Sequence, residues 1–245
     1  MQTITSRHNP AFKDLLVAKK DKDLMLLEGR RLVEDAFARG IQPSKVALTP
    51  EYVEAFGPII FPYILLSGQL FSLLAETTTP QGILIFAEIP WSSLADIKRH
   101  EKVIILDGIQ DPGNVGTIIR TAEAFGYDML VVTPETASPF CAKAIRASMG
   151  SCLGVKIVRA TPDELKDIDH SIISVVPDGT SKLEPGLFLG RVAVCFGQEG
   201  RGISADVLEI SRHTVRVPMK GPTESLNVAV TAGIVLAYAA QVIQG

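Results

Sequence analysis

The chain has 245 residues, a length that suits two domains or one large α/β domain. With 47% hydrophobic and 21% charged residues it has enough apolar side chains for a packed core, which excludes an intrinsically disordered protein. The 24 Lys and Arg against 27 Asp and Glu give a net charge of −3, a balance that taken alone argues against a nucleic-acid binder.

Cysteine usage and hydropathy indicate the compartment. The three cysteines show no CxxC or Cys/His spacing, so we expect neither a disulfide framework nor a zinc site, and a reducing environment. The first residues lack the apolar core of a signal peptide, and the longest apolar stretch, residues 228–240, is shorter than the roughly 20 residues that span a membrane. We therefore expect a cytoplasmic protein that uses no metal and no membrane.

Helix and strand patterns alternate over the first ninety residues. The Asn9-Pro10 pair predicts a helix through about Lys19, because Asn caps a helix and Pro fits its first position. Apolar spacing predicts further helices at 30–39 and 68–75, and strands at 24–27, 45–48, 63–66 and 82–87. A composition break at 88–93, followed by a polar stretch at 96–102, predicts a linker. We therefore predict a small α/β domain over residues 1–93 and a second domain over residues 100–245.

The second domain alternates continuous apolar runs with helical patterns. Strands are expected at 103–106, 129–132, 153–158, 171–176, 191–196 and 212–217, with helices at 115–125 and 139–148 and after residue 226. Residues Thr161 and Glu164 have the spacing of a capping box, so they begin a helix and are not catalysts. This alternation predicts an α/β fold with a mostly parallel sheet and helices on both faces.

Three polar segments that follow apolar strands are the candidates for a ligand site, because open α/β sheets bind ligands beyond the carboxyl ends of their strands. In the first, residues 106–120, Asn114 is either a helix N-cap in a tight turn or a site residue. Arg120 is a lone charge among apolar residues, which predicts a buried arginine with a specific anionic partner. Six residues correspond to about 240° around a helix, so Asn114 and Arg120 share a site only if Asn114 precedes the helix.

The other two segments are rich in glycine or precede the last helix. Residues 196–202 hold three glycines spaced G-x-x-G-x-G, which does not match a dinucleotide fingerprint, and Glu199 between them is either a solvated carboxylate or a site residue. In residues 217–227, Ser225 or Thr223 is expected to cap the helix, while Asn227 in its first turn has no such structural explanation. The residues alone thus predict an α/β protein with a glycine-rich ligand site and a buried arginine.

Taken together and in this order, the three segments resemble the signature of the SpoU/TrmH-type RNA ribose 2′-O-methyltransferases of the SPOUT superfamily. Residues 114–120 are similar to the motif N-x-G-x-x-x-R, residues 196–202 to the second motif, and residues 217–219 with 225–228 to the third. The third motif departs from the family at Ala229, where a serine is often found. Residues 6–10 and 27–31 resemble the small substrate-binding domain, similar to an RNA-binding ribosomal protein, that often precedes the catalytic one.

The resemblance implies methylation of a ribose 2′-hydroxyl in structured RNA by a SPOUT domain tied as a trefoil knot. S-adenosylmethionine would bind in the knot near three residues, Gly197, Val217 and Leu226. An obligate homodimer would complete the site between its subunits. Arg120 would lie at the ribose hydroxyl, where it or a phosphate that it holds accepts the proton. The remaining motif residues would orient Arg120, the ribose and the cofactor: Asn114, Glu199, Ser225 and Asn227. In the first domain four residues are expected to bind RNA: Arg7, Asn9, Arg30 and Arg31.

The regional charge agrees with an RNA partner despite the negative total. Residues 1–45 carry nine Lys and Arg against six Asp and Glu, and residues 136–162 carry four basic and no acidic side chains. The ribosomal-protein-like first domain favours rRNA as the substrate. The alternatives are the same reaction on tRNA, an RNA-binding relative without catalysis, and a metabolic α/β enzyme that binds another nucleotide.

Overall fold

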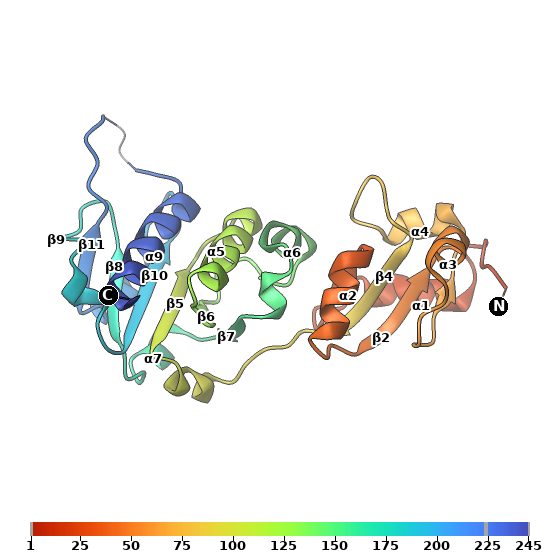
Figure 1. The fold of residues 1–245 in the computed structure, drawn as a ribbon, viewed down its shortest axis with the longest axis horizontal. Coiled ribbons are helices and arrows are strands. Elements are labelled where there is room, and N and C mark those ends of the chain that lie inside the picture. Colours follow the sequence, from red (N-terminus) through yellow and green to blue (C-terminus); the bar gives the residue numbers. More distant parts are fainter. Residues whose placement is uncertain (1, 223–224, 245) are drawn as a thin grey trace. The chain divides into compact units, whose positions relative to one another are not determined.

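The computed structural model describes residues 2–222 and 225–244, with side chains as far as residue 241. Residues up to Ile89 and residues from Pro90 onward form the bulk of two compact units (Figure 1). Each unit has a sheet of its own.

The first unit is a four-stranded sheet with four helices. Its elements are α1 (Pro10–Ala18), β1 (Leu24–Glu28), α2 (Arg30–Ala38), β2 (Pro43–Leu48), α3 (Pro50–Phe56), β3 (Ile64–Leu65), α4 (Gly68–Leu74) and β4 (Ile83–Glu88). The strand order is β1-β4-β2-β3, in which β4 runs antiparallel to both neighbours and β3 runs parallel to β2. Buried side chains of α1 and α4, such as Phe12 and Phe71, pack with Phe86 of β4.

The predicted elements of this unit are confirmed, with one omission. The side chain of Asn9 caps α1 by accepting a hydrogen bond from the N–H of Ala11 at 2.9 Å. Helix α3 was not predicted, although Thr49 and Pro50 have the same cap-and-proline pattern, and Thr49 accepts from the N–H of Tyr52 at 3.3 Å. The signal was present in the sequence, but the helix is too short to show a clear apolar period.

The second unit is built on a seven-stranded sheet. Its elements are η1 (Leu94–Arg99), β5 (Lys102–Asp107), α5 (Pro112–Ala124), β6 (Met129–Val132), α6 (Ala142–Ser148), η2 (Ser151–Leu153), β7 (Lys156–Arg159), α7 (Pro162–Leu165), β8 (Ser171–Val175), β9 (Ser181–Lys182), η3 (Pro185–Phe188), β10 (Val192–Gly197), α8 (Ala205–Glu209), β11 (His213–Arg216) and α9 (Val228–Gln244). The strand order is β7-β6-β5-β10-β8-β11-β9, and all these pairs are parallel. The carboxyl ends of the strands therefore meet at one edge.

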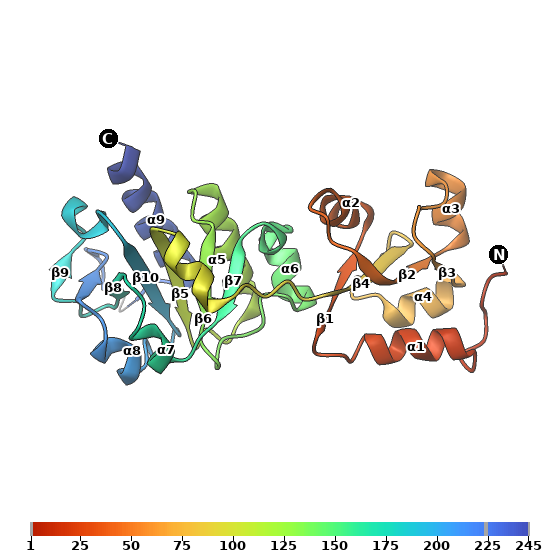
Figure 2. The same ribbon diagram turned by 90° about the horizontal axis from the view of Figure 1, so that it is seen from below.

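Helices cover both faces of this sheet, as the alternating pattern predicted (Figure 2). On one face, alternate strand residues such as Val103 and Ile105 pack with Ile97 of η1, Leu165 of α7 and Val207 of α8. On the other face, α5 and α9 pack against each other. No helix in the described part of the chain is long and apolar enough to cross a membrane.

Several boundaries and caps differ from the sequence-based expectations. Strand β7 and helix α6 each begin three residues later than expected. The stretch expected to be a linker contains η1, which begins with a capping box between Ser93 and Asp96. Helix α5 begins three residues earlier than expected, and its N-cap is Asp111 rather than Asn114. The N-cap of α9 is Asn227 rather than Ser225, because the side chain of Asn227 accepts from the N–H groups of Ala229 and Val230. The other expected cap residue, Thr223, lies outside the described residues.

A buried histidine predicts how the stability of the second unit depends on pH. The ring Nε2 of His170 lies 2.8 Å from the carbonyl oxygen of His100, and Nδ1 is buried with no hydrogen-bond partner among the described residues. Burial lowers the pKa of His170, and the hydrogen bond to the His100 carbonyl only partly offsets this effect.

Since the pKa of His170 is lower in the folded chain, the unfolded chain binds this proton first. The contribution of neutral His170 to stability is present above the unfolded pKa of about 6.5, and we expect it to be lost as the pH falls below that value. The melting temperature measured from pH 8 to pH 5 should fall less steeply in His170→Gln, which keeps a donor for the His100 carbonyl. Equal slopes for the two proteins would contradict this assignment.

Candidate active site

The main cavity of the candidate site lies at the carboxyl ends of β8 and β10 and in the loops that follow β10 and β11. Its volume is about 500 Å³. It is lined by residues 175–178, 196–203 and 208, and by Val217, Met219, Ser225, Leu226, Val228 and Thr231. The structure thus brings the second and third predicted segments to one cavity, including Gly197, Val217 and Leu226.

The glycine segment forms a tight loop that closes on the end of β10. The backbones of Gln198 and Gly202 exchange two hydrogen bonds, at 3.0 Å and 2.8 Å. A Cβ atom at Gly197 would lie 2.4 Å from the carbonyl carbon of Gly202, so only glycine fits there. The N–H of Ser204 donates to the buried carboxylate of Asp107 at 2.6 Å, which fixes the end of the loop to β5.

Three side chains, one from each predicted segment, form a hydrogen-bonded cluster beside this cavity. One carboxylate oxygen of Glu199 accepts from the amide nitrogen of Asn114 at 2.9 Å and from that of Asn227 at 2.6 Å. The amide nitrogen of Asn227 also donates to the side-chain oxygen of Asn114 at 3.2 Å. Glu199 therefore holds together residues that are up to 113 positions apart in the chain.

The start of α5 is fixed by an acidic cap that the sequence analysis did not single out. Asp111 accepts from the N–H of Gly113 at 3.1 Å and from the ammonium of Lys143 at 2.5 Å. The Lys143 hydrogen bond, with a smaller effect of the Gly113 N–H, holds the pKa of the Asp111 carboxyl below its ordinary value. Asn114 lies inside the first turn of α5, where it reaches Glu199.

Arg120 lies apart from this cluster. Its side chain is exposed, so the prediction of a buried arginine is wrong, and it makes no ion pair or hydrogen bond among the described residues. Because Asn114 and Arg120 are both within α5, they are separated by about 240° around the helix. Within one chain the two side chains therefore point in different directions from the axis of α5.

The other predicted site residues are Ser225 in the second unit and four expected RNA-binding residues in the first unit. Ser225 lines the cavity, and its hydroxyl has no hydrogen-bond partner in the described part of the chain. In the first unit, Asn9 is occupied as the cap of α1, and Arg30 pairs with Glu34 at 2.6 Å while its guanidinium lies 4.3 Å from the ring centre of Phe56. The other two, Arg7 and Arg31, are exposed.

The sequence analysis missed one wall of the cavity. Residues Val175 to Asp178 line it directly after β8. The signal was the run Pro177-Asp178-Gly179 after an apolar strand, which is typical of a turn at a sheet edge. Among the described residues no group of three His, Cys, Asp or Glu side chains is placed to hold a metal ion.

Comparisons with known proteins agree on one family. Residues 101–237 match the SpoU rRNA Methylase family. The chain is 33% identical to the 23S rRNA (guanosine(2553)-2′-O)-methyltransferase RlmP of Bacillus subtilis over 96% of this chain and 98% of that protein. It is 32% identical to an uncharacterized tRNA/rRNA methyltransferase of Synechocystis, over 96% and 92% of the two chains. The AdoMet-bound rRNA methyltransferase from Sinorhizobium meliloti has the same fold, with a TM-score of 0.84, 27% identity, and coverage of 98% and 97%.

Proposed function

The chain belongs to the SpoU rRNA methylase family, and we propose that it methylates a ribose 2′-hydroxyl of ribosomal RNA with S-adenosylmethionine. The observation that carries this proposal is the cluster of Glu199, Asn114 and Asn227, which joins the three predicted segments beside a glycine-lined cavity. The rRNA target is supported by the B. subtilis relative named for that reaction. We propose that the protein works in the cytoplasm, where its substrate is made.

The cavity fits S-adenosylmethionine. Its volume of about 500 Å³ lies within the usual range of roughly 300–1,000 Å³ for small-molecule sites. Gly197 leaves the backbone open to a ligand, apolar side chains such as Met219 and Leu226 suit an adenine ring, and the carboxylates of Asp178 and Glu199 suit a cation. When bound, S-adenosylmethionine supplies a methyl group activated by its sulfonium.

The residues of this chain then have to position the ribose hydroxyl and remove its proton. Asn114 uses one amide hydrogen on Glu199 and keeps a second, which we assign to the ribose. We assign the hydroxyl of Ser225 to the cofactor. A guanidinium group has only hydrogen-bond donors and no acceptor, so we propose that Arg120 holds a backbone phosphate whose oxygen accepts the proton.

We propose that Arg120 acts on the active site of the partner subunit in a homodimer. Its position on the outer face of α5, far around the helix from Asn114, supports a site completed by a second chain. Val230 and Ile234 on the outer face of α9 are 52% and 40% exposed, and they offer an apolar surface next to the cap residue Asn227. A second copy would cover this surface.

The first unit is proposed to bind the RNA, through Arg7, Asn9, Arg30 and Arg31. The exposed Arg7 and Arg31 are open to phosphates, whereas Arg30 would have to leave Glu34 and the side chain of Asn9 would have to leave its cap. We also propose the trefoil knot of the SPOUT fold, which the non-sequential order β5-β10-β8-β11 supports.

Methyl transfer to defined RNAs tests the proposed function. The protein should transfer tritiated methyl groups from S-adenosylmethionine to 23S rRNA transcribed in vitro, and the product should resist alkaline cleavage at one position. Transfer to tRNA alone would replace the proposed substrate. Absence of transfer to either RNA, together with calorimetric binding of NAD(H) instead of S-adenosylmethionine, would favour a metabolic enzyme.

A further inference from the structure

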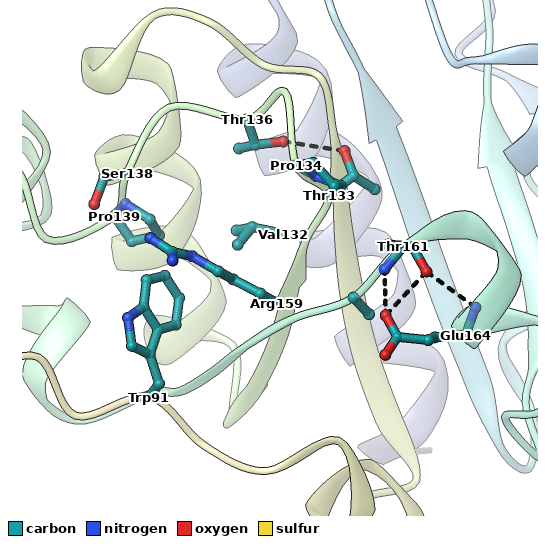
Figure 3. Close-up of a pocket in the computed structure, with 11 residues that line it drawn as sticks. Trp91, Val132, Thr133, Pro134, Thr136, Ser138, Pro139, Arg159, Thr161 and Glu164 are labelled. Carbon is teal, nitrogen blue, oxygen red and sulfur yellow. Dashed lines mark hydrogen bonds between the residues drawn. The ribbon is translucent and has the colours of Figure 1, made fainter. Parts of the chain in front are cut away.

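A second pocket of the catalytic unit lies at the carboxyl ends of β6 and β7. Its volume is about 400 Å³, and it is lined by Trp91, Val132, Thr133, Pro134, Thr136, Ser138, Pro139, Arg159, Ala160, Thr161 and Glu164 (Figure 3). Val132 and Arg159 are the last residues of their strands. The pocket therefore lies on the same edge of the sheet as the main cavity of the candidate active site, which is at the ends of β8 and β10, and β5 lies between the two.

A stacked pair of side chains forms one end of this pocket. The guanidinium carbon of Arg159 lies 4.0 Å from the ring centre of Trp91. The backbone holds the pair in place, because Trp91 forms a parallel bridge with Ile157 and the N–H of Ser92 donates to the Ile157 carbonyl at 2.8 Å. Trp91 is thus held beside Ile157 of β7, and Ile157 precedes Arg159 by two residues.

Arg159 places a positive charge in the wall of this pocket. Its side chain makes no ion pair with any carboxylate in the described ranges of the chain. Glu164 accepts from the N–H and the hydroxyl of Thr161, and in Figure 3 it lies at the opposite end of the pocket from the guanidinium. One end of the pocket thus offers a stacked cation and the other a carboxylate that is bound to a helix cap.

The floor of the pocket is connected to the loop that leads to Asn114. The N–H of Gly108, just after β5, donates to the hydroxyls of Thr133 and Thr136 at 3.1 Å and 3.0 Å. The hydroxyl of Thr136 donates to the carbonyl of Leu106 at 2.8 Å. A ligand held here would therefore be positioned by the same rigid edge that positions the candidate active site.

We propose that this pocket binds a nucleotide of the RNA substrate next to the one that is methylated. The edge of the Arg159 guanidinium would bind the phosphate, and the base would lie against the apolar wall formed by Val132, Pro134 and Pro139. An arginine stacked on an aromatic ring is pre-oriented, which suits recognition of a flexible strand. The proposal rests on the proposed function, since it names a subsite for the same RNA.

The pocket contains the only tryptophan of the sequence, so intrinsic fluorescence reports on it directly. Titration of the protein with an RNA fragment that includes the methylated nucleotide should quench this fluorescence. Titration with S-adenosylmethionine alone should leave it unchanged. If the RNA is methylated but does not change the fluorescence, the subsite is wrong and the proposed function stands; if quenching occurs without methyl transfer, the proposed function is wrong.

Variants separate a binding role from a structural one. Arg159→Ala removes the phosphate contact and Trp91→Ala removes the ring that orients the guanidinium. Both should raise the KM for RNA roughly tenfold, as expected for the loss of one charge-assisted hydrogen bond, and leave the Kd for S-adenosylmethionine unchanged. Arg159→Lys keeps the charge without the planar group and should recover only part of the affinity, whereas Trp91→Phe should recover most of it. Lys182→Ala, which removes an exposed positive charge on the far edge strand β9, is the control and should behave as wild type. Unchanged KM values in both Arg159 variants, with melting temperatures as in the wild type, would overturn the proposal.

Discussion

Two inactive variants, Arg120→Ala and Glu199→Ala, should together form a dimer that is active. Alone, each is expected to lose at least about a hundredfold in kcat, the loss typical of removing a group that stabilises the transition state. Arg120 is exposed on α5 and separated from the Glu199 cluster, so we expect each site to combine Arg120 of one subunit with Glu199 of the other. A heterodimer of the two variants then contains one site with both residues.

Co-expression with two different affinity tags allows this heterodimer to be purified. It should methylate RNA at about half the wild-type rate, because one of its two equivalent sites is intact. The matched control pairs a wild-type chain with a chain that carries both substitutions, and this dimer should be inactive. A site formed within one chain predicts the reverse result, with an inactive first heterodimer and a half-active control.

The elements of both sheets could be predicted because they depend on local patterns. The continuous apolar run of β5 and the Asn9-Pro10 cap of α1 each carry their signal within a few residues. The start of a helix is harder to predict where two residues can each cap it. At the start of α5, Asp111 and Asn114 both have suitable side chains, and the contact of Asp111 with Lys143, far along the chain, is not visible in the pattern.

The arginine was misjudged for a different reason. Arg120 is surrounded in sequence by Ile118, Ile119 and Ala122, all of which are buried. Around the helix axis these three side chains lie within an arc of about 100°. Arg120 lies about 100° beyond Ile119 and therefore outside this arc. Neighbours in the sequence are therefore poor evidence of burial within a helix.

The assembly of the site depends on strand order, which local patterns do not determine. Glu199 meets Asn114 because β10 pairs directly with β5, although many residues separate the two strands in the chain. The family resemblance of the three segments predicted that they act together. It did not extend to the wall at Val175–Asp178, which joins the cavity because β8 is the other neighbour of β10.

Gly197→Ala should abolish most of the S-adenosylmethionine binding while the protein remains folded. The new Cβ would lie 2.4 Å from the carbonyl carbon of Gly202, 2.5 Å from its oxygen and 2.5 Å from the nitrogen of Ile203. All three atoms belong to the backbone, so the clash can be relieved only by moving the loop. The cost in stability should be on the order of 1–3 kcal/mol, as for other overpacked sites.

The substitution should weaken binding of the cofactor as well as lower the stability, because the displaced loop also carries Glu199. A shift of this loop opens the cavity wall and pulls Glu199 away from Asn114 and Asn227 at the same time. Calorimetry should therefore show at least roughly a tenfold higher Kd for S-adenosylmethionine, since 1.4 kcal/mol corresponds to a factor of ten. Gly186→Ala is the matched control, because a Cβ there meets nothing within 4 Å. Wild-type affinity in Gly197→Ala would show that the close approach of Gly197 to Gly202 is not needed for the cofactor, and would place its binding elsewhere.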